Sequence, residues 1–359
     1  MIPIQSAAPI GVAQNPHGAF AAEKEELLSV RDLHVQFSLP SGTVRAVEGV
    51  SFTLRRGETL GIVGESGSGK SVTALAILGL IARPFGRVSG HVDYDSKDLL
   101  TLDTPALQKI RGNRIAMIFQ DPMSCLNPVF TIGSQLVETV RLHMRMGGRE
   151  AFDYSTDMLA RVGIPLPTQR MREYPHQLSG GMRQRVMIAM ALACKPQILL
   201  ADEPTTALDV TIQAQIVDLM LALQEETGTS ILLISHDMGL VAETCDRVAV
   251  MYAGQIIESA PVADLFAAPR HPYTAGLLRS IPRLRTDRSM PRVEKLQAIS
   301  GVVPSPRALR VGCAFQPRCT QAMEICAGTA PLLQNLSAAH SARCWLHEPQ
   351  PAAQVPFTS

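Results

Sequence analysis

Short apolar runs alternate with longer stretches of helical composition from Leu27 to about Glu258. The runs have the length of strands and the stretches between them the length of helices, so the alternation predicts an α/β fold with a largely parallel sheet and helices on both faces. The first helix is expected at Ser71 to Ile81. The expected strands are Leu28 to Phe37, Val50 to Leu54, Thr59 to Val63, Arg114 to Phe119, Ile198 to Ala201, Ser230 to Ser235 and Arg247 to Tyr252.

Two segments depart from this pattern. Over about 121–178 no strand is expected and the composition is helical, which predicts an inserted helical subdomain. Beyond it, prolines recur after Glu258 and cysteines follow, so a smaller C-terminal extension is expected at 260–349. The remaining expected parts are a main domain at 24–259, a flexible N-terminal tail at 1–23 and a loose terminus at 350–359.

Composition disfavours two classes of protein. Hydrophobic residues make up 46% of the 359 residues, which suffices for a core, while the formal net charge is only +1. This near balance argues against a broad basic face for nucleic acid. No apolar run approaches the ~18–20 residues that a membrane span requires. The N-terminal residues also lack a signal pattern, so the chain is expected in the cytosol, with any membrane contact made through a partner.

One segment carries the pattern G-x-x-x-x-G-K-[ST] at every fixed position. It follows the apolar run ending at Val63 and precedes the expected helix, as a phosphate-binding loop requires. Glycines let backbone N–H groups converge on phosphate oxygens, and the helix adds its positive N-terminus. Lys70 can reach the β- and γ-phosphates of a nucleotide such as ATP, and the Ser71 hydroxyl can bind Mg²⁺. The loop consists of Gly64, Glu65, Ser66, Gly67, Ser68, Gly69, Lys70 and Ser71.

Two carboxylates follow a later apolar run. Ile198 to Ala201 leads directly into Asp202 and Glu203. In P-loop enzymes an aspartate at this place supports the Mg²⁺ ion, so Asp202 is assigned that role. Glu203 lies one residue further, where a carboxylate can orient or deprotonate the attacking water. Together with the loop, this pair predicts hydrolysis of the bound nucleotide.

The eight residues from Leu178 read Leu-Ser-Gly-Gly-Met-Arg-Gln-Arg and lie just before the aspartate strand. They resemble the LSGGQ signature of ABC ATPases, with Ser179, Gly180 and Gly181 at its phosphate-facing positions. The resemblance implies an ABC-type nucleotide-binding domain of the P-loop NTPase fold, with an inserted helical subdomain. It also implies a dimer in which the signature of one chain contacts ATP held by the other.

Three further positions match landmarks of the same family. Gln120 resembles the Q-loop glutamine, which senses Mg²⁺ and couples to membrane subunits. Asp209, at the end of Ala-Leu-Asp, resembles the D-loop aspartate, and His236 resembles the switch histidine at the γ-phosphate. By this resemblance Gln120 and Asp209 also belong to the ATP-binding set. The catalytic residues implied are Glu203, His236 and Gln120, and the Mg²⁺ ligands implied are Ser71, Gln120 and Asp202.

The sequence departs from the family pattern at two places. Met182 replaces the last residue of the LSGGQ form and leaves the phosphate-facing residues unchanged. The aromatic residue that stacks on adenine is not identified, since Phe37 has the right chemistry while the spacing leaves Val44 close to the expected position. All catalytic positions are retained, so the resemblance implies hydrolysis and not only binding.

Longer segments narrow the resemblance. Phe119 to Pro128, Ala201 to Thr211 and His271 to Leu278 are similar to the ATPases of oligopeptide and dipeptide importers. The resemblance implies a peripheral protein on the cytoplasmic face of the inner membrane, with peptides as the solute, although relatives that import nickel or other small solutes leave those open. The implied partners are a second, different ATPase subunit, two transmembrane permeases and an extracytoplasmic solute-binding protein.

Two functions outside transport were weighed. A soluble ABC ATPase acting on ribosomes or DNA usually has two ATPase modules or long coiled-coil insertions, and neither occurs in this sequence. An iron–sulfur redox protein with an incidental nucleotide fold would not need the complete set of hydrolytic residues. The sequence therefore favours transport over both.

The seven cysteines are distributed unevenly along the chain. Cys125, Cys194 and Cys245 are scattered and are expected to be reduced thiols. The other four are spaced C-x5-C-x6-C-x17-C, which is wide for a zinc finger and unlike common ferredoxin spacings. Members of the resembling family carry a four-cysteine iron–sulfur cluster, so a [4Fe–4S] cluster is expected, with structural zinc and unliganded thiols as alternatives. The four are Cys313, Cys319, Cys326 and Cys344.

Overall fold

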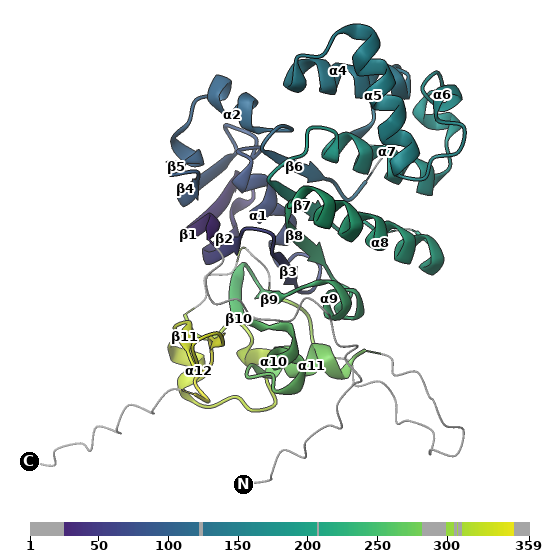
Figure 1. The fold of residues 1–359 in the computed structure, drawn as a ribbon. Helices are drawn as coiled ribbons and strands as arrows, with labels where there is room; N and C mark the ends of the chain where they lie inside the picture. Colours follow the sequence, from purple (N-terminus) through teal and green to yellow (C-terminus); the bar gives the residue numbers. More distant parts are fainter. Residues whose placement is uncertain are drawn as a thin grey trace, which may run out of the picture.

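A computed structural model of the chain describes residues 25–121, 125–206, 208–281, 299–304, 307 and 311–347. The predicted tail at 1–23 and the predicted terminus at 350–359 lie outside these ranges. Within them, two sheets form the framework of the fold (Figure 1). No helix in the described part of the chain is long and apolar enough to cross a membrane.

The smaller sheet is antiparallel and has the strand order β2-β1-β4-β5. Residues of β1 alternate between buried and exposed over much of its length, as expected of a strand with one face on a core. The sequence predicted one largely parallel sheet, and this second sheet was missed because its strands mix polar and apolar positions. Its strands are β1 (Glu26–Leu39), β2 (Gly42–Arg55), β4 (Gly86–Tyr94) and β5 (Lys97–Asp98).

The larger sheet has the order β11-β12-β10-β9-β3-β8-β7-β6. The strands from β9 to β6 are parallel neighbours, and β10, β12 and β11 extend one edge in antiparallel pairs. The strands are β3 (Thr59–Val63), β6 (Ile115–Ile118), β7 (Ile198–Asp202), β8 (Ser230–Ser235), β9 (Arg247–Tyr252), β10 (Gln255–Pro261), β11 (Gln334–Asn335) and β12 (Ser341–Ala342).

The parallel strands are buried on both faces, which explains why they are apolar at nearly every position. In β7, Leu199 and Ala201 contribute to one core and Ile198 and Leu200 to the other. The first core is filled by helices α7, α8 and α9. The second is filled by helix α1 and the antiparallel sheet, so that sheet covers one face where helices were expected. These helices are α1 (Lys70–Ile77), α7 (Gly180–Leu192), α8 (Val210–Thr227) and α9 (Met238–Thr244).

Helices α4, α5 and α6 follow β6 and lie at one end of the molecule, in the segment where the sequence predicts a helical insertion (Figure 1). No strand occurs in the described residues between 125 and 178. The insertion packs against the main core through buried apolar side chains, among them Leu136 and Met158. The helices are α4 (Ile132–Met144), α5 (Gly148–Arg161) and α6 (Pro167–Arg170), while α2 (Thr104–Ile110) lies before β6.

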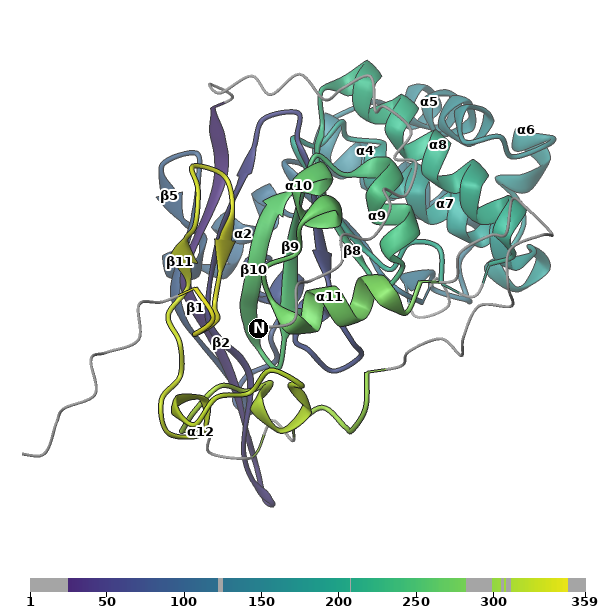
Figure 2. The same ribbon diagram turned by 90° about the horizontal axis from the view of Figure 1, so that it is seen from below.

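The C-terminal extension joins the larger sheet instead of standing apart from it. Strand β12 pairs with β10, with Glu258 opposite Ala342. Glu258 is fully buried and accepts hydrogen bonds from the backbone N–H groups of Arg270 (2.6 Å) and His271 (2.8 Å), and its other contact is His340 Nε2 at 2.8 Å. The helices of this region are α10 (Val262–Ala267), α11 (Pro272–Arg279) and α12 (Ile325–Gly328) (Figure 2).

Candidate active site

The phosphate loop turns from the buried strand β3 into helix α1. Gly69, the residue before the helix, has φ +102, and a Cβ atom there would collide with the carbonyl oxygen of Ala46. Gly64 is similarly closed in, because a Cβ would collide with the carbonyl of Met251. Only glycine fits two such places, one with a left-handed backbone and both against neighbouring main chain. The pattern of glycines thus follows from the packing of the loop.

Lys70 lies under this loop. Its side chain is buried, and Nζ donates to the carbonyl oxygens of Gly64 at 2.8 Å and Glu65 at 3.0 Å. Burial lowers the pKa of Lys70, and the nearby carboxylates of Glu203 and Asp202 counteract this. A cation is therefore held at the mouth of the loop, where a phosphate would bind.

Helix α1 begins without a side-chain cap. Gly69 is its N-cap residue, no side chain accepts a hydrogen bond there, and no acidic residue lies in the first turn. The first N–H groups of a helix have no partner within the helix and carry its positive dipole end. With Lys70 beside them, they fit an anion such as a nucleotide phosphate.

Ser71 and Asp202 face each other at the same place. Ser71 Oγ donates to Asp202 Oδ1 at 3.0 Å. Asp202 is 5% exposed, and burial raises the pKa of its carboxyl group, opposed by the hydrogen bond from Ser71. A hydroxyl and a carboxylate are hard oxygen ligands, so this pair fits a Mg²⁺ ion bound together with a phosphate.

Glu203 receives three polar side chains. Its Oε2 accepts hydrogen bonds from Gln120 Nε2 (2.9 Å) and Thr206 Oγ1 (2.8 Å), and His236 Nδ1 lies 3.2 Å from Oε1. Its backbone has φ +46, a left-handed conformation that is uncommon for a residue with a side chain. Burial alone would raise the pKa of Glu203, but the hydrogen bonds from Thr206 and His236 lower it overall. The carboxylate is thus ionised and fixed in direction.

The signature residues lie elsewhere in the chain. Ser179 is the N-cap of α7, where its hydroxyl accepts from the N–H of Met182 at 3.3 Å, and Gly180 and Gly181 form the first turn. Asp209 caps α8 in the same way, accepting from Ile212 N–H at 2.9 Å. In the described part of the chain, none of these residues hydrogen-bonds to the phosphate loop. The structure therefore brings the loop, Asp202, Glu203, Gln120 and His236 together and leaves the signature apart, while Ala207 of the D-loop pattern lies outside the described residues.

The two candidates for an adenine contact are neighbours. Phe37 and Val44 are paired across β1 and β2. Directly opposite residues of an antiparallel pair share one face, so both side chains lie on the same side of the smaller sheet. A contact with either residue would therefore place the adenine on the same face of the smaller sheet.

Three residues at the site were not predicted from the sequence. Thr206 donates to Glu203, while Tyr273 and Arg318 contact Glu65 of the phosphate loop. Thr206 follows Glu203 by three residues and could have been found as a local hydrogen-bond donor. Arg318 lies 253 residues from Glu65, so only the fold could reveal its contact.

Two family descriptions match the chain. Residues 47–206 match the family described as ABC transporter. Residues 257–326 match the oligopeptide/dipeptide transporter, C-terminal region. The second match covers most of the region between β10 and α12.

Several curated proteins are similar over most of their length. A probable peptide ABC transporter ATP-binding protein, y4tR of Sinorhizobium fredii, is 52% identical over 320 residues, or 89% of this chain and 94% of the relative. The oligopeptide transport ATP-binding protein AppD of Bacillus subtilis is 49% identical, covering 91% and 99% of the two chains. OppD of Escherichia coli, named as an oligopeptide transport ATP-binding protein, is 51% identical and covers 86% and 90%.

Solved structures share the fold. The ATP-binding cassette MJ0796, in a dimeric post-hydrolysis state bound to ADP and phosphate, aligns with a TM-score of 0.59 at 30% identity. The match covers 66% of this chain and 99% of that chain. The protein cbiO1 of Clostridium perfringens, described as part of the ABC transporter complex cbiONQ, aligns with a TM-score of 0.57 at 30% identity, covering 68% and 92%. The fold is thus that of an ABC cassette, a P-loop NTPase.

The predicted iron–sulfur cluster is contradicted. The four C-terminal cysteines line one cavity of only about 10 Å³, which is the room of roughly one water molecule. Among the described residues no group of three or more His, Cys, Asp or Glu side chains could hold a metal ion, which removes the zinc alternative there too. The relatives AppD and OppD are named simply as transport ATP-binding proteins. None of the seven cysteines forms a disulfide.

The two left-handed glycines of the loop give a matched test. Gly67 has φ +77 with open space where a Cβ would lie, and Gly69 has φ +102 with the Ala46 carbonyl there. Gly67→Ala should therefore lower the free energy of unfolding by only about 1–2 kcal/mol, the cost of the left-handed backbone. Gly69→Ala should cost about 3 kcal/mol or more, because main chain must also move. Urea unfolding of the purified chains measures both, and equal costs would show that Ala46 does not constrain the loop.

Proposed function

The chain belongs to the family of ATP-binding subunits of peptide ABC transporters, and from this membership we propose that it hydrolyses ATP to drive the import of di- and oligopeptides. It is a transport ATPase with the ABC cassette fold. The observation that carries the proposed mechanism is the convergence of Gln120, Thr206 and His236 on one ionised carboxylate, that of Glu203. The Glu203 carboxylate also interacts electrostatically with the ammonium group of Lys70 in the phosphate loop.

The loop and its surroundings bind the nucleotide in this proposal. Lys70 and the first amide groups of α1 hold the phosphates of ATP. Ser71, Asp202 and Gln120 are assigned to Mg²⁺: Ser71 and Asp202 contact each other, and Gln120 contacts Glu203, the residue after Asp202. The ion, when bound, neutralises phosphate charge during phosphoryl transfer.

Glu203 acts as the base that orients and deprotonates the attacking water. Its lowered pKa keeps it ionised at neutral pH, and the donors from Gln120 and Thr206 fix its direction. His236 is 62% exposed and lies against the opposite oxygen of the carboxylate, from where it can contact the γ-phosphate. Each of these side chains thus has a role set by its position around Glu203.

A second ATPase subunit completes the site in this proposal. Ser179 and Gly180 are exposed and make no hydrogen bond to the phosphate loop of the same chain, so a second chain must bring a signature to the loop. The dimeric state of the related cassette supports this arrangement. We further propose that the second subunit is a different ATPase, and that two permeases and a solute-binding protein complete an importer at whose cytoplasmic membrane face this chain lies.

Substitution at Glu203 separates binding from chemistry. Glu203→Gln in the assembled transporter should keep ATP binding and lower turnover by roughly 10²-fold or more, because it removes the base but not the phosphate contacts. Lys70→Ala should instead weaken ATP binding, since it removes the buried cation. Equilibrium binding and phosphate release measure the two effects. A normal turnover rate for Glu203→Gln would remove Glu203 from this role.

Thr206 tunes the pH dependence of hydrolysis. Activity should fall as pH drops through the pKa of Glu203, and this pKa is below its ordinary value partly because Thr206 donates to the carboxylate. Thr206→Val should raise that pKa, so the acid limb of the turnover–pH profile should move to higher pH. Thr206→Ser keeps the donor and should leave the limb in place. An unmoved limb in Thr206→Val would show that this hydrogen bond does not set the acid limit.

The need for a partner ATPase can be tested by subunit omission. The isolated chain should hydrolyse ATP slowly, because no signature faces Lys70 until two chains meet. The full assembly with permeases and the second ATPase should be much faster and stimulated by solute-loaded binding protein. Full, solute-stimulated activity from this chain and the permeases alone would contradict a heterodimer.

A further inference from the structure

Glu65, the second residue of the phosphate loop, is held by a side chain from the C-terminal extension. Arg318 Nη1 lies 2.8 Å from Glu65 Oε2, and Nη2 lies 3.0 Å from Oε1. Two parallel N–H···O bonds of this kind fix the orientation of both groups and are among the stronger hydrogen bonds in proteins. Arg318 and Glu65 are 253 residues apart in the sequence, so their contact joins the extension directly to the nucleotide site.

Arg318 is itself fixed on every side. Its side chain is 5% exposed, Nε donates to the carbonyl of Ser300 at 2.9 Å, and Nη2 donates to that of Ile299 at 3.3 Å. Its guanidinium carbon lies 5.8 Å from the ring centre of Tyr252 and 5.9 Å from that of Phe315. The hydrogen bond with the Glu65 carboxylate raises the pKa of Arg318. A cation so enclosed depends on its single carboxylate partner, because an unpaired buried charge is costly.

A second contact reaches the same loop residue. The backbone N–H of Glu65 donates to the hydroxyl oxygen of Tyr273 in α11 at 2.9 Å. Tyr273 is fully buried, and its ring packs 4.6 Å from Tyr252 and 5.4 Å from Phe315, centre to centre. Three aromatic rings and Arg318 thus form one rigid support under Glu65.

Glu65 also connects this support to the catalytic lysine. Its carbonyl oxygen accepts from Lys70 Nζ at 3.0 Å, while its N–H and carboxylate are held by the extension. The backbone N–H of Glu65 is therefore bonded to the extension, and its carbonyl oxygen is bonded to Lys70. Because the loop around it contains three glycines, an external anchor is a direct way to limit its conformations.

We propose that Arg318 and Tyr273 are positioning residues through which the C-terminal extension sets the geometry of the phosphate loop, so that affinity for ATP depends on a docked extension. The proposal rests on the proposed role of this loop in ATP binding. Neither residue touches ATP in this scheme, and both act through Glu65. The extension is then part of the nucleotide site as well as of the larger sheet.

The test is ATP binding to the full-length chain carrying Arg318→Gln. The dissociation constant for Mg-ATP, measured by titration calorimetry, should rise by roughly tenfold, in line with the loss of one charged hydrogen-bond pair. In the assembled transporter, KM for ATP should rise while kcat at saturating ATP changes little. Arg318→Lys keeps one charged contact and should restore part of the affinity. Tyr273→Phe removes only the hydroxyl acceptor and should also weaken binding, which keeps the proposal testable if Arg318→Gln fails to fold.

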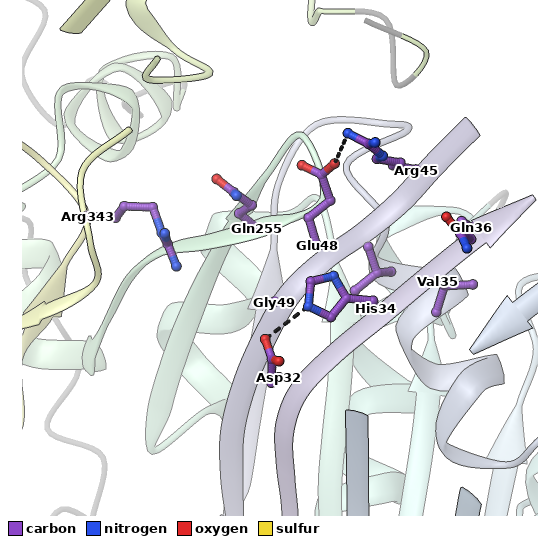
Figure 3. Close-up of a pocket in the computed structure, with 10 residues that line it drawn as sticks. Asp32, His34, Val35, Gln36, Arg45, Glu48, Gly49, Gln255 and Arg343 are labelled. Carbon is purple, nitrogen blue, oxygen red and sulfur yellow. Dashed lines mark hydrogen bonds and ion pairs between the residues drawn. The ribbon is translucent and has the colours of Figure 1, made fainter. Parts of the chain in front are cut away.

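Arg343 provides the matched control. It belongs to the same extension and donates to the carbonyls of Ile256 at 3.3 Å and Pro331 at 3.2 Å. Arg343 and Gln255, together with residues of β1 and β2, line a cavity of about 470 Å³. Figure 3 draws these lining residues. Arg343→Gln disturbs the extension without removing a contact to Glu65, so it should leave the affinity for ATP within about twofold of the wild type, as expected for a change away from the site.

Each outcome decides the proposal. A larger loss of affinity in Arg318→Gln and Tyr273→Phe than in Arg343→Gln supports it. No loss in the first two variants, or an equal loss in all three, overturns it, because the effect would then not pass through Glu65. A wild-type chain that binds no ATP would instead contradict the proposed function, so the two failures are distinguishable.

Discussion

The parallel pairing of the five strands from β9 to β6 is the constraint on which the site depends. Val63 at the end of β3 pairs with Ser235 at the end of β8, and Asp202 at the end of β7 pairs with Ile234. The carboxyl ends of parallel strands in register lie at the same end of the sheet, which is where ligands of such folds bind. The residues that follow each strand therefore meet: the phosphate loop after β3, Glu203 after β7 and His236 after β8. A slip of one residue in β7 would turn Asp202 to the opposite face and separate it from Ser71.

The same pairing explains how much the sequence could predict. Central strands such as Thr59–Val63 are apolar at most positions because both faces are buried, so their runs were recognisable. The smaller sheet and β10 mix polar and apolar residues, and so one sheet was expected where there are two. Glu203 and Gln120 could be named from their places after strands, but the hydrogen bond between them joins residues 83 positions apart and follows only from the fold. The cluster expectation failed because spacing carries no information on the room between four thiols, which the cavity shows to be small.

The extension could not be understood from its own segment. Its prolines and cysteines indicated a separate unit, yet β12 hydrogen-bonds to β10 and Arg318 reaches Glu65. Both contacts join residues far apart in sequence, and neither β12 nor Arg318 lies on a motif that the sequence reveals. Burial of the Glu258 carboxylate and the Arg318 guanidinium without hydrogen-bond partners would be costly, so these polar contacts specify one way for the extension to dock. The docked extension and the phosphate loop are therefore in direct contact through Arg318 and Glu65.

We propose that ATP hydrolysis at Glu203 drives peptide uptake. It is tested most directly in vesicles that contain the complete transporter, with ATP inside at the nucleotide-binding subunits and a labelled tripeptide with solute-binding protein outside. The peptide should accumulate inside against its gradient, accumulation should require ATP, and Glu203→Gln in this chain should abolish it. Accumulation at the wild-type rate with Glu203→Gln, or without ATP, would contradict the account.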